Sequence, residues 1–176
     1  MIFFNGFLLK NEEKFFSSIL DTSHFTVAGF SYGSILAFEY VLNNLNTQKK
    51  RIDKLQLFSP AFFDTSDKKF TRTQLFYFAK NRENYQTTFI NNVFYPQKLE
   101  NFEIEFKEND KNDLEKLLTY DWESQKENLE KIIKSGIKIE SYFGEKDKII
   151  DSLKAFEFFK KYSQACFFKE KGHILI

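Results

Sequence analysis

Short apolar runs alternate along the chain with segments in which apolar residues recur every three or four positions. The short runs predict buried strands, and the helical spacing predicts amphipathic helices between them. Strands are expected at residues 2–4, 25–28, 54–58, 137–143 and 165–168. Helices are expected at residues 12–20, 34–45, 121–135 and 151–162. Because strands alternate with helices, we expect an α/β fold with a short, mostly parallel sheet flanked by helices.

One segment interrupts this alternation. Residues 62–120 carry aromatic-rich helical patterns, which include Phe70, Leu75 and Phe78. We therefore expect a helical cap inserted after the third strand of the sheet. The length of 176 residues fits a single domain. The whole chain, residues 1–176, is expected to form that domain, with the cap inside it.

The composition argues against several classes of function. The net charge of +1 gives no reason to expect nucleic-acid binding. The single cysteine, Cys166, has no partner for an intramolecular disulfide and suits a reducing cytosol. Residues 1–6 lack the basic start of a signal peptide, and no apolar run reaches the roughly 18 residues of a membrane span. We expect a cytoplasmic monomer without a membrane span.

A glycine-rich pentapeptide joins the second expected strand to the helix that follows. It comprises Gly29, Phe30, Ser31, Tyr32 and Gly33, and it matches the G-x-S-x-G pattern of a nucleophile elbow in its strand–turn–helix setting. Such a turn strains the backbone of the serine, and the two glycines lie too close to their surroundings for a Cβ atom. The pattern predicts that Ser31 is a nucleophile. The alternative is an ordinary glycine-rich turn.

A serine hydroxyl needs a base to take its proton, and the chain has two histidines. His24 lies before the strand that leads to Ser31, about 20 Å away at the opposite end of the sheet. His173 follows the fifth strand, at the end where Ser31 emerges, and is the candidate base. The alternative is that His173 serves only packing at the surface or at the C-terminus.

The base needs an orienting carboxylate, which should follow another strand at the same end of the sheet. Asp147 comes four residues after Phe143, in a glycine-containing loop. Asp151 is the second candidate, although a helix N-cap is a sufficient structural role for it. With Asp147, the order Ser31, Asp147, His173 is that of α/β-hydrolases. The choice between the two aspartates stays open at this point.

Ester and thioester cleavage also needs two N–H groups that bind the developing oxyanion. The residue after the nucleophile, Tyr32, is expected to supply one of them through its backbone. The loop after the first strand is expected to supply the other, which makes Phe7 the candidate. The alternative for Phe7 is a plain turn after a strand.

Five motifs give the sequence a more specific resemblance. They are Phe3-Phe4-Asn5-Gly6-Phe7, Gly29-Phe30-Ser31-Tyr32-Gly33, Leu55-Gln56-Leu57-Phe58-Ser59-Pro60, Tyr142-Phe143-Gly144-Glu145-Lys146-Asp147 and Gly172-His173. With them the chain resembles a small α/β-hydrolase, and more narrowly the pimelyl-ACP methyl ester esterases of biotin synthesis, in their short BioV-type form. One departure is Asn5, which stands where many relatives have a histidine. The leading strands of larger hydrolases are also missing, so the sheet should be short.

The resemblance implies a compact α/β-hydrolase fold and a defined reaction. The methyl ester of pimelyl-ACP, an acyl carrier protein (ACP) substrate, would be cleaved to pimeloyl-ACP and methanol. Ser31, Asp147 and His173 would form the catalytic triad, with Phe7 and Tyr32 at the oxyanion. No cofactor and no metal are implied, and ACP is the implied partner.

The charge distribution of the expected cap suits such a partner. ACPs are acidic, and their phosphopantetheine arm carries a phosphate. The early part of the cap is rich in basic residues, namely Lys68, Lys69, Arg72, Lys80 and Arg82, whereas residues 100–130 are strongly acidic. We expect an acidic partner to contact the early cap. A solvated charged face is the alternative.

Two other functions remain open. A general carboxylesterase or an acyl thioesterase would use the same triad, and the cap would set the substrate. A non-catalytic binding protein could also keep the fold, although an intact triad in the correct order argues against it.

Overall fold

The computed structural model describes residues 1–47 and 49–176. Its main sheet has five strands in the order β1-β3-β4-β6-β7, and all neighbouring strands are parallel. The strands are β1 (Ile2–Phe4), β3 (Thr26–Phe30), β4 (Lys54–Phe58), β6 (Lys138–Gly144) and β7 (Gln164–Phe168). The apolar runs therefore predicted each strand of this sheet to within about two residues, and the expected α/β fold is confirmed.

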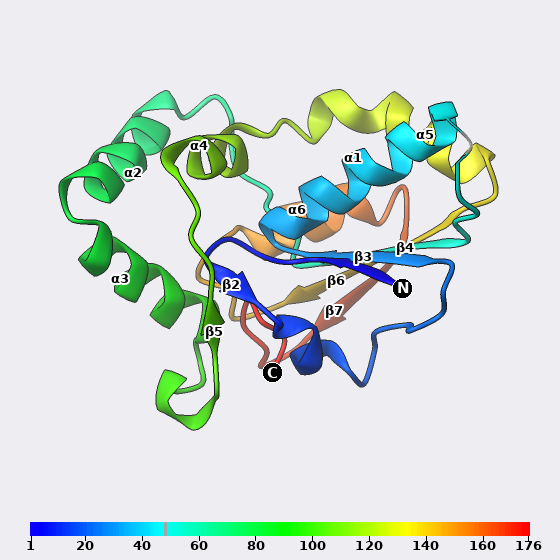
Figure 1. Cartoon of the computed structure of the whole chain (residues 1–176). Helices are drawn as coiled ribbons and strands as arrows, with labels where there is room; N and C mark the ends of the chain where they lie inside the picture. The colour runs from blue at the N-terminus through cyan, green and yellow to red at the C-terminus, as the bar shows by residue number, and fades with distance from the viewer. Residues whose placement is uncertain (48) are drawn as a thin grey trace.

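Three helices pack above the sheet in Figure 1: α1 (Tyr32–Thr47), α5 (Lys126–Lys134) and α6 (Ser152–Phe159). Trp122 packs between α1 and α6, with its ring centroid 5.2 Å from that of Phe38 and 5.0 Å from that of Phe159. Its indole N–H donates to the Ala61 carbonyl at 2.8 Å. A large aromatic side chain is stable in the core when its polar atom has such a partner.

The other face of the sheet packs against η1 (Glu12–Phe16), a short 3-10 helix. The Phe16 ring stacks on Phe58, with ring centroids 4.5 Å apart. The sequence predicted a longer helix over residues 12–20, and this expectation is wrong. Asn11, at the start of the helix, has a left-handed backbone and its side chain makes no capping hydrogen bond. A single turn held by Phe16 remains, because a short uncapped helix gains little from its own hydrogen bonds.

The other expected helix bounds need smaller corrections. The helix α1 begins at Tyr32, directly after Ser31, instead of at residue 34. The segment expected as one helix from residue 121 begins with a 3-10 turn, η3 (Glu123–Gln125), before α5. Gly136 follows α5 with a φ of 89°, a left-handed conformation that ends a helix and that glycine adopts at little cost.

Residues 62–120, which we call the cap segment, lie beyond the carboxyl ends of the strands (Figure 1). The segment contains α2 (Lys68–Lys80), α3 (Arg82–Phe94), the 3-10 turn η2 (Leu99–Asn101), β5 (Glu105–Phe106) and α4 (Lys111–Thr119). The strand β5 pairs in antiparallel fashion with β2 (Leu9–Lys10), a small second sheet that the sequence pattern did not predict. This sheet ties the cap segment to the loop after β1.

In the part of the chain that the structure describes, no helix combines the length and the apolar character needed to cross a membrane.

Candidate active site

Ser31 lies in a tight turn between β3 and α1. Its φ is 54°, in the left-handed region that non-glycine residues rarely adopt. Its N–H donates to the Phe58 carbonyl at 2.8 Å, and its carbonyl accepts from the Ala61 N–H at 3.2 Å. A Cβ atom on Gly29 would collide with the Gly33 carbonyl, and one on Gly33 would collide with the Phe4 carbonyl, so both positions need glycine. The pentapeptide thus has the geometry of a nucleophile elbow.

The structure places His173 between Ser31 and Asp147. The Ser31 Oγ lies 2.9 Å from His173 Nε2, and the Asp147 Oδ2 lies 2.6 Å from His173 Nδ1. Ser31 is 2% exposed and His173 is fully buried. When the Asp147 carboxylate accepts the Nδ1–H, the Nε2 atom is free to accept the Ser31 proton. The three side chains therefore form one continuous hydrogen-bonded chain.

The two candidate aspartates have different surroundings. The second carboxylate oxygen of Asp147 accepts from the N–H groups of Ile149 and Ile150 at 2.7 and 3.0 Å. Asp151 instead accepts from the Lys154 N–H at 3.0 Å and forms the N-cap of α6. The structure thus brings Asp147 to the histidine and gives Asp151 the helix-capping role that the sequence offered as its alternative.

Ser59 is a residue of the site that the sequence analysis missed. Its hydroxyl donates to the backbone carbonyl of His173 at 2.6 Å, and its own φ is 41°. On the other side, the Phe30 ring packs against the imidazole with centroids 5.1 Å apart. Together these contacts fix the position of the imidazole. In the sequence, Ser59 stands directly after β4, within the motif Leu55-Gln56-Leu57-Phe58-Ser59-Pro60, where it was assigned no role of its own.

The two amides expected at the oxyanion belong to loops at the same edge of the sheet, because β1 and β3 are parallel neighbours. On either side of Phe7, the N–H of Gly6 donates to the buried Glu12 carboxylate, and the N–H of Leu8 donates to Asn109 Oδ1 at 2.7 Å. Among the described residues, no acceptor takes the N–H of Phe7 or of Tyr32. Neither amide is therefore committed to a hydrogen bond within this part of the chain.

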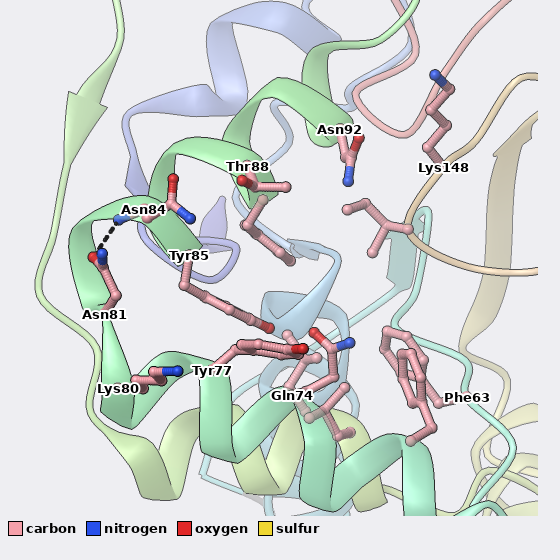
Figure 2. A pocket seen from close by; sticks show the side chains of 15 residues that line it. Phe63, Gln74, Tyr77, Lys80, Asn81, Asn84, Tyr85, Thr88, Asn92 and Lys148 are labelled. Atoms are coloured by element: carbon pink, nitrogen blue, oxygen red, sulfur yellow. Dashed lines mark hydrogen bonds between the residues drawn. The ribbon is translucent and has the colours of Figure 1, made fainter.

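A cavity of about 430 Å³ lies between α2 and α3. Figure 2 shows its side chains, which include the amides of Gln74, Asn81, Asn84 and Asn92, and the ammonium groups of Lys80 and Lys148. Its apolar part comprises Phe63, Phe70, Phe89, Leu117, Leu118 and Ile149. No aspartate or glutamate lines this cavity among the described residues, so its only charged groups are cationic.

Ser31, His173 and Asp147 do not line the cavity, but two of its lining residues contact the loops of the site. The Phe7 ring, which is 1% exposed, meets the ring of Phe89 edge-on at 5.5 Å. On the other side, Ile149 lines the cavity while its N–H donates to Asp147. A ligand in the cavity would therefore lie next to both the oxyanion loop and the acid loop.

The five basic residues that the sequence offered for an acidic partner divide into two groups. Four of them are exposed on α2: Lys68, Lys69, Arg72 and Lys80. Arg82, at the start of α3, instead donates to the Asn109 carbonyl at 2.8 Å and lies over the Phe78 ring. It therefore has a structural contact of its own. Within residues 1–47 and 49–176, no group of three or more His, Cys, Asp or Glu side chains is arranged to hold a metal ion.

Comparison with solved structures identifies the fold. An esterase from Exiguobacterium antarcticum matches with 18% identity and a TM-score of 0.53, over 84% of this chain and 59% of its own. A naproxen esterase from Bacillus subtilis matches with 15% identity and a TM-score of 0.48, over 85% of this chain and 53% of its own. A thioesterase domain from the curacin biosynthetic pathway matches with 13% identity and a TM-score of 0.44, over 93% of this chain and 64% of its own.

The match to the Exiguobacterium esterase, with its TM-score above 0.5, supports a compact α/β-hydrolase fold. The chain spans between about half and two thirds of the length of these three structures. No family model and no curated protein matches the sequence. The fold is thus assigned by structure, and the chemistry has to be argued from the site.

Proposed function

We propose that this protein is a serine esterase that hydrolyses the methyl ester of pimelyl-ACP to pimeloyl-ACP and methanol. The observation that carries the enzymatic part is the hydrogen-bonded chain from Ser31 through His173 to Asp147. The resemblance of the five sequence motifs carries the choice of substrate. A non-catalytic role is disfavoured, because a strained serine bonded to a buried histidine costs stability that a binding protein has no reason to keep.

The proposed reaction has two halves. In the first, His173 Nε2 takes the Ser31 proton while Oγ attacks the ester carbonyl, and the amides of Phe7 and Tyr32 bind the resulting oxyanion. The tetrahedral intermediate collapses as His173 returns the proton to the leaving methoxide, which departs as methanol. In the second, His173 takes a proton from water, whose oxygen attacks the acyl-enzyme. Collapse of this intermediate releases the acid and restores the Ser31 hydroxyl.

The cavity between α2 and α3 is the proposed site for the rest of the substrate. Its aromatic and aliphatic residues suit an acyl chain, and its amide side chains suit the amide groups of a pantetheine arm. Lys80 and Lys148 would favour an anionic group at its mouth. This assignment makes the cap segment the part of the chain that selects the substrate.

A general carboxylesterase or an acyl thioesterase is the second candidate, since both reactions use the same three residues. The two candidates separate by substrate. We expect the purified protein to remove the methyl group from pimelyl-ACP methyl ester at a higher kcat/KM than it shows with p-nitrophenyl butyrate or with pimeloyl-ACP thioester. Loss of the methyl group is measured by mass spectrometry. Hydrolysis of p-nitrophenyl butyrate without hydrolysis of the ACP-linked ester would indicate a general carboxylesterase. Preferred release of free ACP from the thioester would indicate a thioesterase.

We predict that the exposed basic residues of α2 affect only the ACP-linked substrate. The triple variant Lys68→Glu, Lys69→Glu and Arg72→Glu is expected to raise KM for pimelyl-ACP methyl ester by about 10-fold or more, because it repels an acidic partner. Its kinetics with p-nitrophenyl butyrate should not change. Arg82 is left out of this variant because it holds the Asn109 carbonyl.

A matched control carries three charge reversals at the opposite end of the sheet. Lys49, Lys50 and Lys138 are exposed there, and their change to glutamate alters the net charge by the same amount. This control should keep the wild-type KM for the ACP-linked ester. Equal effects of the two triple variants would contradict a docking role for α2.

A further inference from the structure

Two side chains of the cap segment join the two loops that carry the proposed oxyanion amides. Asn109 Oδ1 accepts from the Leu8 N–H at 2.7 Å, and Asn109 Nδ2 donates to Asp113 Oδ2 at 2.8 Å. The other oxygen of Asp113 accepts from the Tyr32 hydroxyl at 3.0 Å. The hydrogen-bonded path therefore begins at the residue after Phe7 and ends on Tyr32 itself.

We infer that Asn109 and Asp113 are positioning residues, which set the distance between the Phe7 and Tyr32 amides. The inference rests on the proposed function. Leu8 has a φ of 65°, so the turn after Phe7 is in a backbone conformation that needs outside support. Asn109 supplies that support from one side, and Asp113 relays it to the side chain of the residue that follows the nucleophile.

The centre of the path is buried and has further hydrogen bonds within the cap segment. Asn109 is 7% exposed, and its backbone carbonyl accepts from Arg82. Asp113 belongs to a capping box at the start of α4, in which the Asp110 carboxylate accepts from the Asp113 N–H at 2.9 Å. The backbones of both residues are thus held by contacts within the cap segment, in addition to the contacts of their side chains along the path.

The protonation states agree with the direction of these hydrogen bonds. Burial by itself raises the pKa of Asp113, but the hydrogen bonds from Asn109, the Asp110 N–H and Tyr32 bring that pKa below its usual value. Burial and the bond to Asp113 raise the pKa of Tyr32. Asp113 therefore accepts as a carboxylate at neutral pH, and Tyr32 donates as a neutral phenol.

A positioning role and a purely structural role make different predictions. If the path only attaches α4 to the core, its loss lowers stability and leaves the chemistry of folded molecules unchanged. If it places the two amides, its loss weakens binding of the transition state more than binding of the substrate. Loss of one oxyanion donor costs other enzymes about 10² to 10³ in kcat, so a misplaced pair is expected to cost roughly 10- to 100-fold.

The chain offers a rescue experiment. Asn109→Asp puts two carboxylates face to face. Asp113→Asn alone is expected to be mild, because the introduced amide can turn so that its oxygen accepts from Asn109 Nδ2 while its NH2 donates to the Tyr32 hydroxyl. The double variant restores a donor opposite an acceptor, because the amide introduced at position 113 can donate to the carboxylate introduced at position 109. The carbonyl oxygen of that amide can still accept from Tyr32. Only the weaker contact from the Asp110 N–H, at 3.2 Å, is lost.

With p-nitrophenyl butyrate, Asn109→Asp is expected to lower kcat by about 10- to 100-fold at an unchanged KM, whereas Asp113→Asn should stay close to the wild-type kcat. In Asn109→Asp, affinity for an alkyl boronic acid, which mimics the tetrahedral intermediate, should fall by a similar factor. The double variant should regain at least half of the loss on a logarithmic scale. Tyr32→Phe, which removes a single hydroxyl group, should reproduce the loss of kcat even if Asn109→Asp folds poorly.

Asp67→Ala is the matched control, because it removes a carboxylate that caps α2, in the same cap segment, without contact to either loop. It should lower the thermal midpoint and keep kcat. The inference is overturned if wild-type turnover is retained in Asn109→Asp and in Tyr32→Phe, or if their losses follow the thermal midpoint and the double variant shows no rescue relative to Asn109→Asp. If the wild type neither turns over esters nor reacts with a fluorophosphonate at Ser31, the proposed function fails and this inference fails with it.

Discussion

Ser31→Ala is expected to lower kcat for ester hydrolysis by about 10⁴-fold or more without unfolding the protein. The hydroxyl is the atom that forms the acyl-enzyme, and neither water nor a neighbouring side chain replaces it in that position. The change deletes one buried oxygen whose hydrogen-bond partner, His173 Nε2, lies 2.9 Å away. The backbone hydrogen bonds that hold the φ of 54° do not involve the side chain, so they remain in the alanine variant.

The measurement combines turnover with covalent labelling. Wild-type protein should react with a fluorophosphonate, and the mass of a peptide containing Ser31 should increase, whereas Ser31→Ala should show neither reaction nor turnover. Ser152→Ala is the control, since Ser152 is also buried but belongs to α6. Persistent hydrolysis by Ser31→Ala, at a rate close to that of the wild type, would rule out Ser31 as the nucleophile.

The sequence was most informative where a local rule determines structure. Each strand of the main sheet is a short apolar run, and the elbow around Ser31 needs two glycines for steric reasons that hold for any chain. The site of His173 followed from the same reasoning, because the carboxyl ends of parallel strands meet at one edge.

What the sequence did not predict depends on contacts between distant segments. The Leu8 amide meets Asn109 across 101 positions, and the small sheet of β2 and β5 has only two residues in each strand. Neither feature has a periodic pattern. Asn109 lies in a polar run that is typical of a solvated loop, so its burial becomes visible only when the cap segment is placed against the core.

Asp147→Asn is expected to lower kcat and Asp151→Asn to leave it unchanged, and this pair decides which aspartate orients the histidine. In Asp147→Asn, the amide oxygen can still accept from Ile149 and Ile150, so the loop keeps its shape. The amide NH2 then faces His173 Nδ1 and makes that nitrogen an acceptor. The proton moves to Nε2, which can no longer accept from Ser31, and kcat is expected to fall by about 10⁴-fold.

Asp151→Asn should keep the wild-type kcat and the wild-type stability to within about 0.5 kcal/mol, because asparagine caps a helix as well as aspartate does. The carbonyl oxygen of the new side chain can accept from the Lys154 N–H as the carboxylate does now. The two variants are compared by kcat with p-nitrophenyl butyrate and by their thermal midpoints. Loss of activity in Asp151→Asn, together with near-normal activity in Asp147→Asn, would reverse the assignment. Since the two substitutions are chemically identical and lie close together in the chain, a difference in kcat reports only on which carboxylate faces the imidazole.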